Sequence, residues 1–472
     1  MGRVAGYIAT IISAVWVSNT IYANTLHLQD VLHSASAHYP KILEAKQKLQ
    51  QANASRLSAE GAFDVLVTQE TRKRTSGFYD GFYANQKIIK PLREANAKMF
   101  AEYRLSDGTF PVYEDQFATL DQGEIAVGVS FSLLRNRDID AYRLALKNAD
   151  LDITIQTFQQ KAVLNHVLFN ASLAYIEWLS ATLQFEVYKQ LLKNATTRQE
   201  AINKRIQLGY SAKIDLLDNE QNVLKREAIL LKIKNEVDLR AMKLALYWRD
   251  DKGQPIKMAH DIKPVLPTTL FTHIVSKVSP NIDNLIEEAL RLHPDIQHVE
   301  NTILKENNNQ QLFKNELKPN ADITIKLSQD AGDGSPTREG FESYIGFEFS
   351  MPLERRKAKG KIMKSSAKIR ELQFVRQRLT EALQVTLNQS NIKFTNATEQ
   401  ASLTQKRASI TQTLLAQELK RFEQGASDIF MLNLREKDMA EAKIDAITTD
   451  LSRLVAGIEL LGKAYKMHST LN

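Results

Sequence analysis

The sequence predicts an α+β membrane protein in which short β-strands precede pairs of very long α-helices. Two segments in which apolar and polar residues alternate stand in front of long stretches nearly free of glycine and proline. Three short sequence segments of the first half also recur, in the same order, in the second half. The chain has 472 residues, of which 25% are charged and 8% aromatic. Long helices with narrow apolar stripes need fewer apolar residues than several compact cores, and this composition fits them.

The N-terminus has the composition of a signal peptide, which we expect over residues 1–23. Arg3 is followed by an apolar stretch from Val4 to Val17, and small Ala23 stands before a plausible cleavage point. This stretch is too short to span a bilayer, and no later segment approaches about 18 consecutive apolar residues, so membrane-spanning helices are not expected. A buried N-terminal helix is the alternative. The chain has no cysteine, which excludes a disulfide framework and a lipid-anchored N-terminal cysteine.

Three landmarks occur twice in the same order, which predicts an internal duplication. The paired segments are 38–40 with 292–294, 131–137 with 349–355, and 205–216 with 421–432. The last pair shares Arg, Gly, Ser and Leu in step, and Glu220 falls opposite Glu436. We therefore expect a first repeat over residues 24–248 and a second over residues 284–472. Prolines interrupt the helical pattern over residues 249–283, which we interpret as a linker or equatorial segment.

Each repeat is expected to contain one pair of long helices, over residues 138–248 and 354–465. Apolar residues from Ile139 onwards step by three and four, which is the spacing of a coiled-coil seam. About 65 residues of helix at 1.5 Å per residue extend on the order of 100 Å. Gly209 and Gly425 stand where the two helices of each pair must reverse direction. A pair this long cannot bury its apolar stripe alone, so neighbouring helices are needed.

Each repeat is also expected to contain a strand pair, at about 63–73 with 123–133 and at about 320–328 with 342–351. Alternation makes one face of these strands apolar and the other small or polar. Their length is that of a tilted strand crossing hydrocarbon. Four strands are too few to close, and open edges are not tolerated in lipid. Several chains must therefore contribute to one barrel, and three chains with four strands each would give twelve strands, with the helix pairs packed side by side into a hollow cylinder. A soluble sandwich would show the same alternation.

The two strand pairs differ in their connections. About 50 residues, from Arg74 to Gly123, join the first pair, whereas a short turn rich in glycine joins the second. The long connection is dense in aromatic residues, and disordered tracts are poor in them. We expect this connection to form an ordered extracellular cap over the pore.

These features, in this order, resemble the TolC-like outer-membrane efflux and type I secretion channels. The resemblance includes the junctions Leu133-Leu134-Arg135 and Met351-Pro352-Leu353 and covers nearly the whole chain after residue 23. It implies a homotrimer whose twelve-stranded β-barrel, with four strands per chain, lies in the lipid of a Gram-negative outer membrane and is continued in the periplasm by a long α-helical coiled-coil tunnel. It also implies a periplasmic adaptor protein and an inner-membrane pump or ABC exporter as partners.

The resemblance further implies two sets of site residues near the glycine turns. In that family the turns lie at the periplasmic tips, where the adaptor docks. The docking candidates are Leu208, Gly209, Tyr210, Gln424, Gly425 and Ala426. Aspartates just beyond the tips often narrow the entrance and attract cations. The entrance candidates are Asp215, Asp218 and Asp428. Met431 and Leu434 match Asp215 and Asp218 in the second half, which departs from the family pattern. Plain helix turns and a solvated helix face are the alternatives.

No pattern in the sequence predicts an enzyme, a metal site or a cofactor. The histidines do not fall in a metal-binding spacing, and neither a phosphate-binding glycine loop nor a nucleophile elbow is present. The basic run from Arg355 to Lys364 has little aromatic interleaving, so nucleic acid is not an expected partner. We expect a passive export duct, with a soluble periplasmic coiled-coil adaptor or scaffold as the alternative. A single subunit does not reveal whether the cargo is a small molecule or a polypeptide.

Overall fold

The computed structural model describes residues 25–210, 212–258, 262–265 and 282–470. The predicted signal peptide, residues 1–23, lies outside the described residues. The described chain divides into two compact units. The turn unit contains the described residues of Met1–Ala35, Ala171–His273 and Thr398–Val455, and the sheet unit those of Ser36–Asn170, Ile274–Ala397 and Ala456–Asn472. Each unit is considered by itself.

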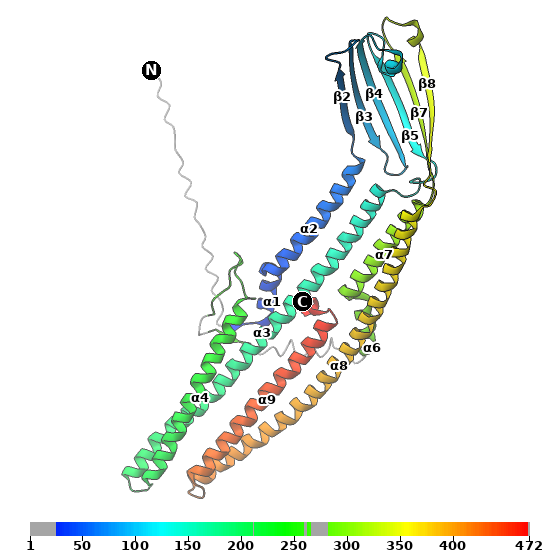
Figure 1. Cartoon of the computed structure of the whole chain (residues 1–472). Helices are drawn as coiled ribbons and strands as arrows, with labels where there is room; N and C mark the ends of the chain where they lie inside the picture. Colours follow the sequence, from blue (N-terminus) through cyan, green and yellow to red (C-terminus); the bar gives the residue numbers. More distant parts are fainter. Residues whose placement is uncertain (1–24, 211, 259–261, 266–281, 471–472) are drawn as a thin grey trace, which may run out of the picture. The chain divides into compact units, whose positions relative to one another are not determined.

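The sheet unit contains an antiparallel sheet of six strands, in the order β2-β3-β4-β5-β7-β8 (Figure 1). Its strands are β2 (Leu66–Lys73), β3 (Gly81–Pro91), β4 (Ala97–Gly108), β5 (Glu124–Ser132), β7 (Asn320–Asp330) and β8 (Phe341–Ser350). Every strand has eight or more residues. Five of the strands are nine to twelve residues long, which is close to the length that a tilted strand needs to cross hydrocarbon.

The prediction of four strands per chain is wrong, because the sheet of one chain has six strands. β2 pairs with β3 and β5 pairs with β4 and β7, so the expected pairing of β2 with β5 does not occur. The expected extracellular cap, residues 74–123, instead contributes strands β3 and β4 and the 3-10 helix η2 (Val112–Phe117). The reason lies in residues 97–104, where small or apolar residues alternate with residues that are polar except for Phe100, within the stretch that its aromatic content marked as a cap.

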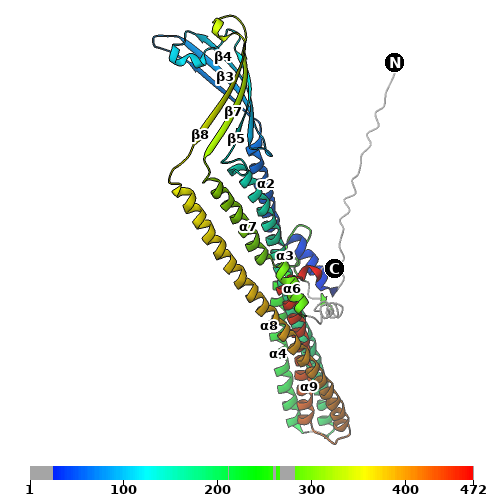
Figure 2. The same cartoon turned by 90° about the vertical axis from the view of Figure 1, so that its right-hand side faces the viewer.

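Four helices join the sheet at one end. The 3-10 helix η1 (Gly61–Phe63) connects α2 (Pro40–Glu60) to β2, and α3 (Ala141–Gln207) follows β5. α7 (Pro294–Asn315) precedes β7, and α8 (Arg356–Glu423) follows β8 (Figures 1 and 2). Pro40 and Pro294 each stand in the first turn of a helix, where their missing N–H costs no hydrogen bond.

Ion pairs connect these helices within the sheet unit. The guanidinium Nε of Arg56 on α2 lies 2.6 Å from Asp150 on α3, and Lys305 on α7 lies 2.6 Å from Asp152. Next to the sheet, the buried amide of Asn315 donates a hydrogen bond to the carbonyl of Ile139 at 2.9 Å. The short helix α6 (Ile282–Leu292) precedes α7.

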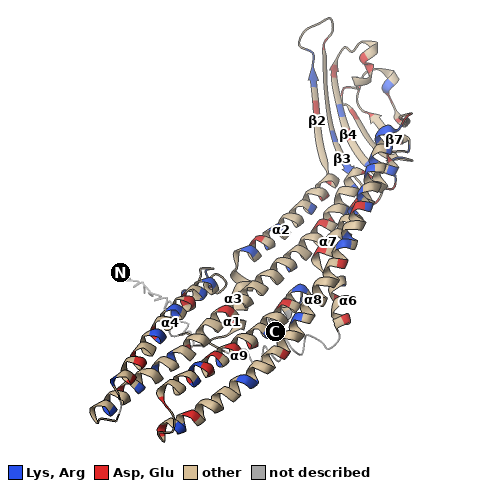
Figure 3. Cartoon of the chain, turned by 60° about the horizontal axis from the view of Figure 1, so that its bottom comes forward, with Lys and Arg blue, Asp and Glu red and all other residues tan. Residues whose placement is uncertain are grey.

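The turn unit contains the second parts of α3 and α8 together with α4 (Lys213–Ala245), most of α9 (Ile429–Lys463) and most of α1 (Leu28–His38). Val187 and Leu191 of α3 pack against Ala440 of α9, and Met439 and Ile444 extend this contact. Basic and acidic residues are interspersed along α4, α8 and α9 (Figure 3). Among the described helices, none combines the length and the apolar character that crossing a membrane requires.

One described segment of the linker, residues 262–265, contacts α3 in the turn unit through Val265. β6 (Lys263–Pro264) pairs in parallel with β1 (Thr25–Leu26). The buried hydroxyl of Tyr175 lies 2.8 Å from the carbonyl oxygen of Leu26 and 2.9 Å from that of Val265, so it can donate to either. Burial raises the pKa of Tyr175 well above its usual range. Residues 259–261 and 266–281 of the predicted linker lie outside the described residues.

Candidate functional site

One face of the sheet is apolar and open. Successive side chains of a strand point to opposite faces, and the pairing register assigns each residue to one of them. Large apolar residues on this face are at least 36% exposed: Val67, Ile88, Met99, Ile125, Val127, Ile325, Leu327, Phe341, Ile345, Phe347 and Phe349. A hollow of about 430 Å³ on this face is lined almost wholly by apolar side chains. An exposed apolar surface of this kind is typical of a face that contacts a membrane, another protein or a ligand.

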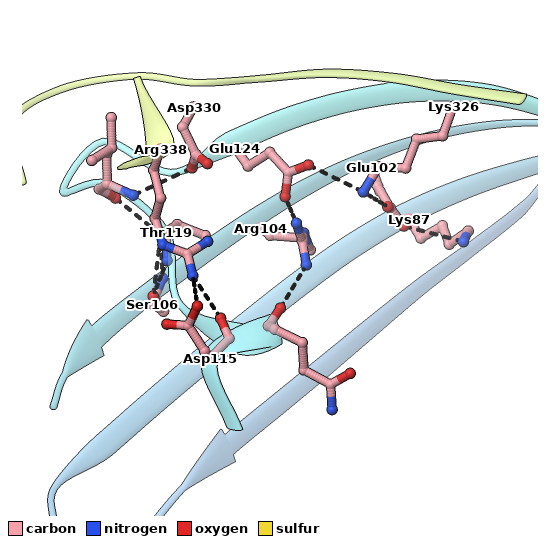
Figure 4. A network of polar contacts seen from close by, with 12 residues as sticks. Lys87, Glu102, Arg104, Ser106, Asp115, Thr119, Glu124, Lys326, Asp330 and Arg338 are labelled. Atoms are coloured by element: carbon pink, nitrogen blue, oxygen red, sulfur yellow. Dashed lines mark hydrogen bonds and ion pairs between the residues drawn. The ribbon is translucent and has the colours of Figure 1, made fainter. Parts of the chain in front are cut away.

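The opposite face, here called the polar face, carries a partly buried network of charges (Figure 4). Glu102 of β4 lies 3.1 Å from both Lys87 of β3 and Lys326 of β7. Lys326 also lies 3.1 Å from Glu124 of β5, which pairs with Arg104 of β4. The side chains of Glu102 and Glu124 are only 9% and 3% exposed. These pairs connect four neighbouring strands, because opposite charges on one face of adjacent strands attract.

The two strands that were not predicted, β3 and β4, therefore contribute charged residues to the polar face of the sheet. Lys87, Glu102 and Arg104 belong to β3 and β4, and their partners Glu124 and Lys326 belong to β5 and β7. Phe100 of β4 lies over Gly128 of β5, where an added Cβ would come within 2.6 Å of the Ile325 carbonyl oxygen. Only glycine allows this close approach.

Both edges of the sheet are open in the single chain. All residues of β2 are exposed, and all but one residue of β8 are exposed. Because the sheet has an even number of antiparallel strands, its two edge strands run in opposite directions. Each edge presents unpaired backbone N–H and C=O groups, which is an obstacle in lipid unless another strand pairs with them.

The two long helix pairs end in the same turn. Gly209 has a φ angle of 78° and Gly425 one of 75°. In each turn the glycine N–H donates to the carbonyl three residues earlier at 3.0 Å, and the next N–H donates to the carbonyl five residues before it at 2.8 Å. Each helix therefore ends in a residue with the left-handed backbone conformation, which glycine adopts without steric strain. The positions expected from the resemblance are all exposed: Leu208, Gly209, Tyr210, Gln424, Gly425 and Ala426.

The three aspartate candidates lie in different settings. Asp218 is exposed and Asp215 is half-buried, in the first turns of α4. The Asp428 carboxylate accepts a hydrogen bond from the Met431 N–H at 2.8 Å and so stabilises the start of α9. Asp428 thus has a structural role of its own.

A buried ionic cluster in the turn unit was not predicted. Glu436 of α9 is 2% exposed and pairs with Arg226 of α4 at 2.8 Å and with Arg198 of α3. Arg226 also donates to the carbonyl of Leu191 at 2.5 Å. The sequence repeat placed Glu436 opposite Glu220, but gave no indication that only Glu436 is buried. Within the described residues, no group of three His, Cys, Asp or Glu side chains could hold a metal ion.

Solved outer-membrane channels share this fold. The VceC outer-membrane protein of Vibrio cholerae has a TM-score of 0.62 at 12% identity, over 93% of this chain and 95% of that one. The MtrE channel of Neisseria gonorrhoeae has a TM-score of 0.63 at 12% identity, over 93% of this chain and 88% of that one. The CmeC channel of Campylobacter jejuni has a TM-score of 0.59 at 11% identity, over 93% of this chain and 85% of that one. No family model and no curated protein matches the sequence. The resemblance to the TolC-like channels is thus confirmed as a shared fold.

Proposed function

We propose that the protein is a subunit of an outer-membrane channel that serves as the exit duct of a tripartite efflux pump or a type I secretion system. The observation that carries this proposal is the two-faced sheet, with an uncovered apolar face, a charged opposite face and two open edges. Lipid suits the first face and water the second. The fold shared with solved outer-membrane channels supports the same function and an outer-membrane location.

The open edges support a homotrimer whose sheets join into one barrel. The β2 edge of one copy can pair with the β8 edge of the next, because the two strands run antiparallel there. A closed ring leaves no unpaired edge in lipid. Three copies of a six-stranded sheet give eighteen strands instead of twelve. Since barrel diameter grows roughly in proportion to strand number, this barrel would be about 1.5 times as wide as a twelve-stranded one.

The strand register is compatible with such a closure. Following the pairs across the sheet leads from Leu66 on β2 to Tyr344 on β8. Leu66 and Ser350 both lie at the end of the sheet next to the helices, and we infer that Leu66 of one copy pairs with Ser350 of the next, which aligns the helix-proximal ends of the two edge strands. That pairing staggers the register by six residues per chain. At about 3.4 Å per residue and about 4.8 Å per strand, the strands tilt by about 35°, close to the tilt of known barrels.

The remaining parts of the chain have matching roles in this proposal. A signal peptide exports the chain, and the long helices of the duplicated halves form the periplasmic tunnel. The tips with Gly209 and Gly425 dock a periplasmic adaptor, which links the duct to an inner-membrane pump or ABC exporter. Asp215, Asp218 and Asp428 lie near the entrance. The channel is a passive conduit for small molecules or polypeptides.

Membrane extraction and conductance test the function. We expect the protein to be released from membranes only by detergent, as a trimer, and to form conducting pores in a planar bilayer. A monomer that osmotic shock releases without detergent would support the alternative, a soluble adaptor or scaffold. The exposed apolar face argues against that alternative, since a soluble protein rarely leaves such a patch uncovered.

Engineered cysteines test the edge pairing. The chain has no cysteine of its own, so every disulfide in a variant comes from the introduced residues. Thr68→Cys combined with Glu348→Cys places both thiols on the polar face at the proposed contact. We expect oxidation to give covalent trimers that resist dissociation in SDS. Thr68→Cys with Phe349→Cys is the control, because Phe349 points to the other face. Equal crosslinking of both pairs, or of neither, would refute the register.

A further inference from the structure

We propose that residues 109–123, here called the collar segment, lie inside the duct at its outer end and form a constriction there. The segment connects β4 to β5 and contains η2. The proposal rests on the proposed function, because a duct exists only if the sheets close with the polar face inward. Val112 and Tyr113 would then form the ring that cargo passes.

Ring contacts show which face the collar segment covers. The ring of Phe117 meets that of Tyr83 edge-on at 5.0 Å, and the guanidinium of Arg72 lies 5.3 Å from the Phe117 ring centre. Arg72 and Tyr83 are direct partners in the β2–β3 ladder and share the face that carries Lys87 and Glu102. The collar segment therefore covers the polar face, at the end of the sheet away from the helices.

Hydrogen bonds attach the collar segment to β4. Arg104 donates to the backbone carbonyl of Gln116 at 3.0 Å. The Ser106 N–H donates to the Thr119 hydroxyl at 3.0 Å, and the Thr119 N–H donates to the Ser106 hydroxyl at 2.7 Å (Figure 4). Reciprocal bonds of this kind fix both the position and the direction of the segment. The segment is a bound part of the polar face.

A second attachment comes from the connection between β7 and β8. Arg338 lies 2.7 Å from the carboxylate of Asp115 and donates to its backbone carbonyl at 2.8 Å. The Asp121 carboxylate accepts from the Asp333 N–H at 2.8 Å, and the Asp121 N–H donates to the Asp333 carbonyl at 3.2 Å. The collar segment is thus held from both sides and spans several strands of the sheet.

The side of the collar segment that is free of these contacts presents apolar groups. Val112 is 94% exposed and Tyr113 66%, whereas Leu120 is 2% exposed. Glu114 pairs with Arg74 at 3.3 Å and Asp115 with Arg338, so the nearby carboxylates are compensated. A barrel of eighteen strands is wide enough to hold three such segments and still leave a passage. The constriction would therefore discriminate by size and apolar character more than by charge.

Thiol modification in a planar bilayer tests the collar. Val112→Cys introduces one thiol per chain. We expect a methanethiosulfonate reagent with a trimethylammonium group to lower the current through one channel in up to three steps, by at least a quarter in total. Ile345→Cys is the matched control, because Ile345 is also highly exposed, at 75%, but lies on the apolar face. Its modification should leave the current unchanged.

The possible outcomes separate the two proposals. A parent protein that reconstitutes as a trimer without any conductance would overturn the proposed function. A conducting channel whose current is unchanged although mass spectrometry shows complete labelling of Val112→Cys would overturn the collar and leave the function intact. Should Val112→Cys not assemble, Tyr113→Cys carries the same expectation. The double variant Val112→Ala with Tyr113→Ala should raise the parent conductance, and a fall would also count against the collar.

Discussion

The two halves of the chain agree at their helix turns and differ in the sheet. Both turns place a glycine at a φ of 75° to 78° and make the same two hydrogen bonds. The first half contributes four strands to the sheet and the second only two. A helix reversal depends on one residue with positive φ, so its geometry is local. A sheet tolerates an added hairpin, because two more strands keep every neighbour antiparallel and leave the edge strands running in opposite directions.

The halves also differ in the burial of the two glutamates that the predicted repeat aligns, Glu220 and Glu436. Glu436 of the second half is buried between Arg198 and Arg226, whereas Glu220 of the first half is exposed. Burial makes a charge costly unless its partners remain. The same residue type at equivalent sequence positions should therefore have unequal effects on stability.

Substitution of Glu436 has the largest expected effect. Glu436→Gln leaves Arg226, which is 7% exposed, without its carboxylate partner, and removal of one partner from a buried pair costs about 3–5 kcal/mol. Thermal unfolding in detergent, followed by circular dichroism, measures the loss. Glu220→Gln is the control and should change stability by at most about 0.5 kcal/mol. Equal losses in both variants would contradict the assigned cluster.

The next largest effect concerns two strand glycines. In Gly128→Ala the new Cβ meets Phe100 and lies 2.6 Å from the Ile325 carbonyl oxygen, so strands must move apart. Overpacking of this kind costs about 1–3 kcal/mol. In Gly346→Ala the three nearest atoms to the new Cβ all belong to the exposed side chain of Tyr344, which can rotate away. Gly346→Ala should therefore be nearly neutral in the same unfolding experiment, and a larger loss there than at Gly128 would refute this packing.

The glycine turns should show a smaller effect of equal size in both halves. Gly209→Ala and Gly425→Ala each force a side chain into the left-handed region, at about 1–2 kcal/mol. Gly360→Ala is the control, because Gly360 lies within helix α8 and an added Cβ there would meet open space. Alanine there should raise stability by about 0.5–1 kcal/mol. A gain of stability at Gly209 or Gly425 would show that the turn differs from the one described.

The smallest expected effect depends on pH. Burial lowers the pKa of His293, and the nearby Asp295 carboxylate offsets this only in part. The unfolded chain then takes up a proton more readily than the folded one, so stability is complete above a pH of about 6.5 and declines below it. Protonation also removes the acceptor Nδ1, which receives the Asp295 N–H at 3.3 Å at the start of α7.

The variant His293→Asn isolates this contribution. Asparagine keeps an acceptor at the start of the helix but does not titrate. We expect the melting temperature of the parent to fall more than that of the variant between pH 7.5 and pH 5.5. Parallel curves for the two proteins would show that His293 does not contribute to the pH dependence.

Much of the local structure follows from the sequence by itself. The long helices lie in the ranges that the spacing of apolar residues indicates, and the reversals lie at Gly209 and Gly425. The alternation of residues also predicted which side chains of β5, β7 and β8 lie on the apolar face and which lie on the polar face. These features depend on residues close together in the chain, through helical periodicity, strand periodicity and the conformational freedom of glycine.

Only the tertiary structure decided the partners of the strands and the surroundings of the charges. The alternation over residues 97–104 can be recognised in the sequence and indicates a strand. Which strand lies beside β2, however, depends on contacts between distant segments. The same holds for the network around Glu102 and Glu124, for the attachment of the collar segment, and for the burial of Glu436. Periodicity determines which face a side chain occupies, whereas pairing across the sheet and between helices determines what lies on that face.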